Sequence, residues 1–198
     1  RHKVKISKPF LIGQMQVTQA LWQAVMGNNP SDFKGDQLPV ECVSWFDSVK
    51  FCNKLSQLEG LNPAYSIGSG DKPEVEWNKR ANGYRLPTEA EWEYVAKAGT
   101  ELIYAGSNNE DEVAWYGSNT DRKTHPVGQK KANAWGLYDC SGNVLEWCND
   151  QWDSDAYINR SGTVEDPSVY GSAVAYRSIR GGRWDGGADF CRVAYRRF

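Results

Sequence analysis

The last 22 residues of the chain concentrate side-chain types that often contact ligands. Residues 177–198 hold six arginines against two aspartates, so this segment carries +4 and the other residues together carry −6 of the net charge of −2. Tryptophan, tyrosine and phenylalanine lie between these arginines. Arginine, tryptophan and tyrosine are the types enriched in binding hot spots. The composition of the segment therefore predicts a binding surface.

Few residues of the chain could act as nucleophiles or as soft metal ligands. The five cysteines, at positions 42, 52, 140, 148 and 191, form no Cys-x-x-Cys motif, and their odd number leaves at least one thiol unpaired. We expect free and mostly buried cysteines, with a Cys140–Cys148 disulfide as the alternative. The two histidines, His2 and His125, are too few for a three-histidine metal site. We expect His125, which precedes a proline, to be a hydrogen-bonding loop residue rather than a catalytic base.

Length and composition predict one packed domain. The 198 residues are 40% apolar and 13% aromatic, which favours a folded core over disorder. The net charge argues against a dedicated nucleic-acid-binding protein. No apolar run approaches the ~20 residues of a membrane span. Because the sequence starts at Arg1, we expect any signal peptide or lipid anchor to lie upstream of it.

Three helices are predicted by the residues that begin and end them. Serine or threonine at the first position of a helix accepts a backbone hydrogen bond, and glycine ends a helix readily. In the second and third helices, Asp47 and Glu91 complete capping boxes. The expected first and last flanking residues are Thr18 and Gly27, Ser44 and Gly60, and Thr88 and Gly99.

The rest of the chain is predicted to form short strands in long loops. Strands are expected over residues 4–7, 10–17, 75–77 and 174–184, and no helix is expected after Gly99. Loops rich in glycine, asparagine and aspartate must be held by buried hydrogen bonds, tryptophan N–H groups or bound ions. We therefore predict a single α+β domain over residues 1–198.

Several peptides that recur together along the chain carry a resemblance to a known family. They are Val17-Thr18-Gln19, Val25-Met26-Gly27, residues 83–94 (GYRLPTEAEWEY), residues 133–139 (NAWGLYD), residues 141–147 (SGNVLEW) and Arg180-Gly181-Gly182. This series resembles the formylglycine-generating-enzyme (sulfatase-modifying factor) family over nearly the whole chain. The resemblance implies a C-type-lectin-like fold, with short helices around a small antiparallel sheet and long ordered loops.

The resemblance does not by itself imply catalysis. The enzymes of the family oxidise a sulfatase cysteine with copper held by two cysteines that follow the Gly-Gly turn, and two thiolates suit Cu(I). The matching positions here are Gly186 and Cys191, so the first thiol is absent. We expect no copper and no enzyme activity. The alternative is a copper-dependent formylglycine-generating oxidase in which Cys191 acts with a ligand from elsewhere.

The C-terminal segment also resembles the variable regions of proteins diversified by retroelements, of the treponemal variable protein type. The segment concerned is residues 177–198, and its expected scaffold residues are Trp184, Ala188, Cys191, Arg192, Val193, Ala194 and Arg196. Arg180, Arg192 and Arg196 are expected to be buried anchors, with ligand contact as the alternative. The alternative to diversification by a retroelement is ordinary sequence drift in a non-enzymatic member of the family. The expected ligand-binding residues are Arg183, Trp184, Asp185, Gly186, Gly187, Asp189, Phe190, Tyr195, Arg197 and Phe198.

A structural calcium ion is a further implication of the resemblance. The carboxylates of Asp139 and Glu146 and the backbone carbonyls of Gly142 and Val144 match a calcium site of the family, and hard oxygen ligands around a tight turn suit this ion. The alternative is an ion-free turn.

We therefore expect a non-catalytic bacterial binding protein. It would be a monomer at the cell surface or outside the cell, and would bind a protein or another cell-surface ligand but no nucleic acid. The alternatives are the oxidase described above and a structural or regulatory accessory domain of a larger protein.

Overall fold

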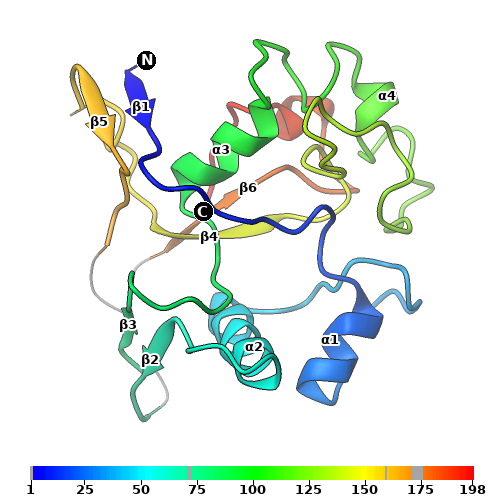
Figure 1. Ribbon diagram of the computed structural model, residues 1–198. Helices are drawn as coiled ribbons and strands as arrows, with labels where there is room; N and C mark the ends of the chain where they lie inside the picture. Colours follow the sequence, from blue (N-terminus) through cyan, green and yellow to red (C-terminus); the bar gives the residue numbers. More distant parts are fainter. Residues whose placement is uncertain (1, 71–72, 159, 171–175) are drawn as a thin grey trace.

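The computed structural model describes residues 2–70, 73–158, 160–170 and 176–198, and its helices lie on both sides of a central pair of strands. The antiparallel strands β4 (Glu146–Gln151) and β6 (Arg177–Arg180) cross the middle of the molecule. Helix α3 (Glu89–Lys97) lies on one side of this pair, and α1 (Gln19–Met26) and α2 (Trp45–Leu58) lie on the other (Figure 1). Short helices and small sheets give the expected α+β fold.

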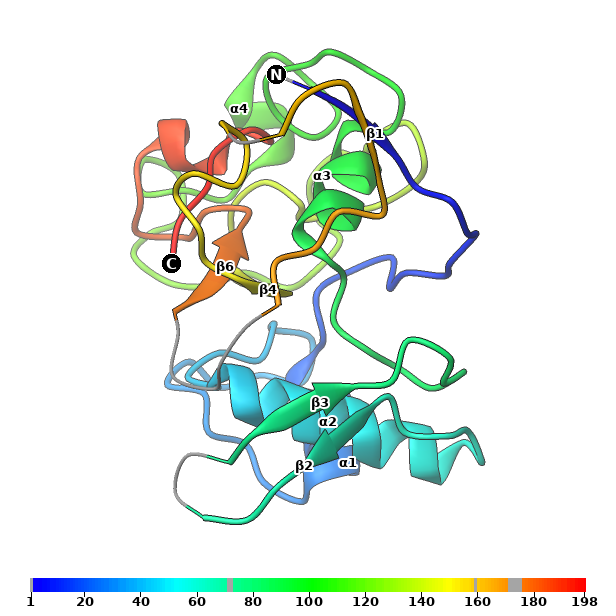
Figure 2. The ribbon, with the colours of Figure 1, turned by 90° about the vertical axis from the view of Figure 1, so that its left-hand side faces the viewer.

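The remaining elements are short and lie around this frame. Two further two-stranded sheets form, one parallel and one antiparallel, and the antiparallel hairpin lies beside α2 (Figure 2). Two helical segments have one turn each. These elements are β1 (Lys3–Lys5) paired with β5 (Thr163–Glu165), β2 (Tyr65–Ile67) paired with β3 (Val75–Trp77), α4 (Glu110–Val113) and the 3-10 helix η1 (Ala188–Cys191).

The three predicted helices are confirmed, and their capping residues act as expected. The Thr18 hydroxyl accepts a hydrogen bond from the backbone N–H of Leu21, and capping boxes begin both α2 and α3. Helix α3 ends one residue earlier than its glycine suggests, because Ala98 adopts the left-handed conformation, with φ of 46°. Local signals were sufficient here because a cap needs only residues within one helical turn.

The strand predictions were less accurate. The strand expected over residues 10–17 is wrong: this segment is irregular and pairs one backbone group at a time with distant loops. The carbonyl of Gln14 accepts from the N–H of Tyr138, and that of Val17 accepts from Val40. The strand expected over 174–184 is only β6, and residues 174 and 175 lie outside the described part. The single helical turns of α4 and η1 correct the expectation of no helix after Gly99.

Tryptophan N–H groups join helix α2 and the loop before it to the central strand β4. The indole of Trp45 on α2 donates to the carbonyl of Cys148 on β4, at 3.0 Å, and the indole of Trp147 donates to Val43. All five cysteines are free and only Cys42 is exposed, so the alternative Cys140–Cys148 disulfide does not form. In the described part of the chain, no helix has the length and the apolar character needed to cross a bilayer.

Candidate binding surface and cation site

A turn of two glycines sends the C-terminal segment back across the end of the central strands. Gly181 and Gly182 follow β6 with φ of 90° and 79°, a conformation that glycine adopts without strain. A Cβ at Gly182 would lie 2.7 Å from Sγ of Cys191 and 2.9 Å from the carbonyl oxygen of Phe190. The segment then returns to β6, where the N–H of Ile179 donates to the carbonyl of Arg197. The close approach therefore requires glycine at position 182.

Exposed and buried side chains are interleaved along this segment. Cys191 and Val193 are buried in the core, as expected of scaffold residues, and Ala188 packs against it. The expectation is wrong for Ala194, which is exposed because it alternates with the buried Val193. Among the expected contact residues, Trp184, Gly186 and Tyr195 are half-buried. The others are exposed, namely Arg183, Asp185, Gly187, Asp189, Phe190, Arg197 and Phe198.

Two arginines hold the segment against α3, and a third does not. Arg196 makes a bidentate pair with the buried Glu89, with N···O distances of 2.6 and 2.8 Å. Arg180, whose side chain is fully buried, binds Glu93 at 2.6 Å and donates to the carbonyl of Tyr195. The expectation of a buried anchor is wrong for Arg192, whose exposed side chain binds the carbonyl of Asp189 one turn earlier.

The cysteine that matches the copper site is not available for that chemistry. Cys191 is completely buried beneath Gly182, and burial raises the pKa of its thiol to about 12. The matching partner position is Gly186, whose carbonyl accepts a hydrogen bond from the N–H of Gly117. One protonated thiol cannot provide the two thiolate ligands of a Cu(I) site.

The predicted calcium ligands surround a single amide group. Nε2 of Gln16 lies 3.1, 3.4 and 3.0 Å from the carbonyl oxygens of Asp139, Gly142 and Val144, and 3.0 Å from Oε1 of Glu146. We call these five residues the cation cage. An amide nitrogen has two hydrogens, so it cannot satisfy four acceptors. Oε1 of Gln16 is buried without a partner in the described part of the chain.

The cage differs from the expected site in how Asp139 takes part. Its carbonyl, and not its carboxylate, faces Gln16, because Oδ2 of the carboxylate accepts from the N–H of Gly128 at 2.7 Å. The carboxyl group of Glu146 is buried, which raises its pKa to about 7, and its Oε2 accepts from the indole of Trp92. Converging oxygen atoms fit a hard cation such as Ca²⁺. Gln16 was missed because nothing in its local sequence marks it.

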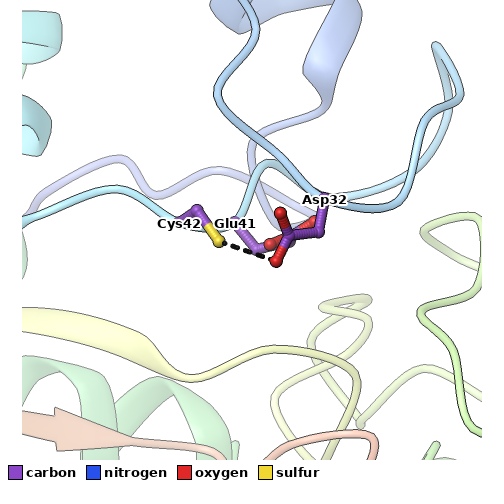
Figure 3. A group of neighbouring side chains, drawn as sticks. All are labelled: Asp32, Glu41 and Cys42. Carbon is purple, nitrogen blue, oxygen red and sulfur yellow. Dashed lines mark hydrogen bonds between the residues drawn. The ribbon is translucent and has the colours of Figure 1, made fainter.

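A second group of ligand-type side chains lies near the start of α2. Asp32, Glu41 and Cys42 come together there, with Sγ of Cys42 3.5 Å from Oδ2 of Asp32 (Figure 3). Hydrogen bonding to Glu41, desolvation and the charge of Asp32 raise the pKa of the Cys42 thiol to about 11. A protonated thiol is a poor metal ligand, so we assign no ion to this group.

Two surface pockets lie close together, because Trp184, which lines the second, packs against Phe33, which lines the first. The first pocket, of about 310 Å³, belongs to loops outside the C-terminal segment, and the second, of about 370 Å³, includes residues of that segment. The first is lined by Phe33, Lys34, Leu38, Lys123, Thr124, His125 and Pro126, and the second by Gly117, Thr120, Arg122, Trp184 and Asp185.

Comparison with known proteins agrees with the fold and with the motifs. The profile of the sulfatase-modifying factor enzyme 1-like domain matches residues 1–198. The chaperone protein LppX of Paenibacillus barcinonensis is 39% identical over 218 residues, which cover 94% of this chain and 73% of that protein. A formylglycine-generating enzyme of Thermomonospora curvata is 31% identical, covering 91% of this chain and 56% of the enzyme.

A solved structure is similar over most of its length. Treponema denticola variable protein 1 superimposes with a TM-score of 0.84 at 42% sequence identity, covering 92% of this chain and 76% of that one. The fold is therefore shared with a variable protein as well as with proteins of the enzyme family.

Proposed function

The chain belongs to the family of sulfatase-modifying factor enzyme 1-like domains, and from this premise we propose that it is a ligand-binding member and not an oxidase. Its contact surface is formed by the exposed side chains of residues 183–198. The observation that carries the proposal is the interleaving of exposed residues with buried anchors along one clamped backbone. Such a backbone can present different side chains without a change in its path.

The exposed positions have the chemistry of a contact surface. Arg183, Phe190, Arg197 and Phe198 are exposed, and Tyr195 is half-buried and packs against Phe190 at 5.0 Å between ring centroids. Aromatic side chains bury much area for little lost entropy, and arginine offers several hydrogen-bond donors, which makes both effective binding residues. Substitution at these positions leaves the pairs of Arg180 and Arg196 intact.

We extend the proposal to diversification of these positions by a retroelement. The similarity to a variable protein supports it. Sequencing of the locus across close isolates tests it. We expect substitutions at codons 183, 185–187, 189–190, 195 and 197–198, with codons 180, 191, 193 and 196 unchanged. If the codons of the exposed residues are as invariant as those of residues 83–94, diversification is contradicted. The domain would then bind a single dedicated ligand.

The oxidase alternative has its own experiment. The reduced chain is incubated with Cu(I) and a cysteine-containing sulfatase peptide, and a formylglycine-generating enzyme serves as the positive control. We expect neither tight copper binding nor aldehyde formation, because Cys191 is buried and its partner position is Gly186. Aldehyde formation that is lost in Cys191→Ser would overturn the non-catalytic assignment.

A protein is the ligand class that the relatives favour. LppX, which is similar over 94% of this chain, is described as a chaperone, and chaperones bind polypeptides. We propose a protein ligand met at the cell surface. Labelling of intact cells with an antibody to this domain tests the location, and labelling that requires permeabilised cells would contradict it.

We also propose that the cation cage holds a structural calcium ion. Gln16 and Glu146 would hold it with side-chain oxygens once the amide of Gln16 turns its Oε1 inward, and Asp139, Gly142 and Val144 would supply carbonyl oxygens. Without an ion, the four surrounding acceptors hold the nitrogen of Gln16 inward, whereas a cation at the centre would favour the turned form, because Oε1 would then face a positive charge. Such an ion would fix the loop that supports Gly181, because the carbonyl of Gly181 accepts from the N–H of Gly142.

A further inference from the structure

The two pockets have separate lining residues, and contacts between those residues make the pockets neighbours on one surface. The ring of Trp184 in the second pocket packs edge-on against Phe33 of the first, at 5.3 Å between centroids. The carbonyl of Thr120 in the second pocket lies 2.9 Å from Nε2 of His125 in the first. The hydroxyl of Thr120 donates to the carbonyl of Trp184. Loops 33–38 and 117–126 therefore supply one half of the surface, and the C-terminal segment supplies the other.

The half outside the C-terminal segment is cationic. Lys34 and Lys123 line the first pocket and Arg122 lines the second, and none of the three has a carboxylate partner in the described part of the chain. Nζ of Lys34 donates to the carbonyl of Asn29, which leaves its charge uncompensated. The one carboxylate of the lining, Asp185, is already paired with Arg183 at 2.6 Å.

Two aspartates lower the net charge of the two loops to +1, since Lys34, Arg122 and Lys123 carry +3 and Asp36 and Asp121 carry −2. Asp36 and Asp121 belong to the same two loops but line neither pocket. Within the first pocket, the Thr124 hydroxyl is buried and has no hydrogen-bond partner among the described residues. A buried hydroxyl without a partner costs free energy that a polar ligand atom would recover. Phe33, Leu38 and Pro126 give the same pocket apolar walls.

The cationic half is also rigid. Asp121 and Arg122 both adopt left-handed conformations, with φ of 50° and 61°, in a turn closed by the N–H of Lys123 donating to the carbonyl of Thr120. The side chain of Asn143 binds both the N–H and the carbonyl of His125. Rings of His125 and Trp115 stack at 3.8 Å. A preorganised surface loses less entropy when a ligand binds.

We propose that this surface binds acidic peptide segments, in which a carboxylate side chain next to an apolar one lies in the two pockets beside Trp184. The inference rests on the proposed binding function and adds a ligand class to it. Loops 33–38 and 117–126 provide the preference for a carboxylate, which every form of the C-terminal segment would share. The exposed residues of that segment then select among acidic ligands.

The test uses two capped tripeptides that differ in one charge. Acetyl-Leu-Glu-Phe-amide and acetyl-Leu-Gln-Phe-amide are titrated into the ¹⁵N-labelled full chain at low salt, and backbone and indole signals are followed by NMR. We expect shifts at Thr124, His125 and the indole of Trp184, and a dissociation constant roughly tenfold lower for the acidic peptide. Raised salt should reduce this preference, because the attraction is between exposed charges.

Variants test which residues provide the preference for the acidic peptide. Arg122→Gln with Lys123→Gln should remove the tenfold difference, whereas the matched pair Lys50→Gln with Lys54→Gln, on the exposed side of α2, should retain it. Lys34→Gln is the second test variant should the first pair fail to fold. Equal affinity for the two peptides, or a preference retained in the test variants, would overturn the inference.

Two further outcomes separate this inference from the proposed function. Binding of inorganic phosphate at Thr124 and Trp184 as tight as that of the acidic peptide would reveal a general anion site and would also overturn the inference. Absence of any shift at the surface overturns it as well. In each of these cases the proposed binding function is unaffected, and diversification of the C-terminal codons is still tested by sequencing, which does not depend on any peptide.

Discussion

At the scale of single residues, one side-chain type has different roles within a few positions. The Arg196 guanidinium pairs with Glu89 and lies over the rings of Tyr157 and Trp152, at 4.1 and 4.7 Å from their centroids. Arg192, four residues earlier, is exposed and contacts Asp189, one 3-10 turn before it. A charge buried with its partner fixes the backbone, whereas an exposed charge contributes little to stability.

The contrast between Arg196 and Arg192 predicts that substituting them has different effects on the stability of the fold. Arg196→Gln should lower the free energy of unfolding by about 3 kcal/mol or more, because Glu89 would stay buried and lose its bidentate partner. Arg192→Gln is the matched control and should change it by less than about 0.5 kcal/mol. Urea denaturation followed by tryptophan fluorescence measures both. Equal losses in the two variants would contradict the assignment of Arg196 as an anchor.

A second residue-scale prediction concerns Asp150. Burial raises its pKa to about 6, although its carboxylate accepts from the backbone N–H groups of Glu89 and Val169. Since the folded-state pKa exceeds the ordinary 3.8, the buried charge penalises folding increasingly between pH 4 and pH 6, and by a constant amount above that range. The stability advantage of the wild type over Asp150→Asn should therefore fall by up to about 3 kcal/mol across this window.

The measurement is urea denaturation of both proteins at half-unit steps from pH 4 to pH 8. A difference that is independent of pH, or that grows with pH, would show that Asp150 is ionised throughout this range in the folded protein.

At the scale of elements, the junction between β6 and η1 determines where the contact surface lies. Gly181 and Gly182 reverse the chain within two residues, and the thiol of Cys191 fills the space where a Cβ of Gly182 would be. The next glycines differ in their surroundings. Gly187 has φ of −69° at the start of η1, and a Cβ there would meet no atom within 4 Å. Only the first pair is therefore required by the path of the backbone.

We predict opposite outcomes for alanine at the two kinds of site. Gly182→Ala should cost about 2–4 kcal/mol, because the added Cβ meets backbone atoms and the conformation is left-handed. Gly187→Ala should change stability by less than about 1 kcal/mol. Thermal unfolding by circular dichroism compares them. A stable Gly182→Ala protein would mean that the segment can leave β6 without unfolding the domain.

At the scale of the whole molecule, the cation cage joins parts of the chain that are far apart in sequence. Gln16 belongs to the connection before α1, and the other members lie 123 to 130 residues later, in the loop before β4 and at its first residue. An ion at this point would bind only the folded chain, because the unfolded chain does not bring these oxygens together. Binding would then stabilise the fold by mass action.

We accordingly predict that calcium raises the melting temperature. With 5 mM CaCl₂ in place of 5 mM EDTA, and a dissociation constant on the order of 50 μM, the gain is about 2.7 kcal/mol, which is about 5–10 °C for a domain of this size. Glu146→Gln should remove most of the gain, and Glu112→Gln, a change at an exposed carboxylate, should keep it. A melting temperature that is unaffected by calcium at millimolar concentration would contradict calcium binding, and the Gln16 amide would then be the group that occupies the cation cage.

The sequence by itself determined the features that depend on neighbours along the chain. The caps at Thr18, Ser44 and Thr88 fixed where the helices begin, and the motif series identified the family, because both signals lie within short stretches of residues. It also gave four of the five members of the cation cage and the contrast between exposed and buried positions after Gly182. These predictions needed no knowledge of which segments meet.

Only the tertiary structure decided which distant segments meet. It made residues 10–17 an irregular connection, since their backbone groups bind Tyr138 and Val40 in place of a neighbouring strand. It brought Gln16 into the cage, buried Arg196 while leaving Arg192 exposed, and placed Phe33 and Arg122 beside Trp184. The physical reason is that pairing between short strands and loops is set by contacts across more than a hundred residues, for which a local pattern carries no signal.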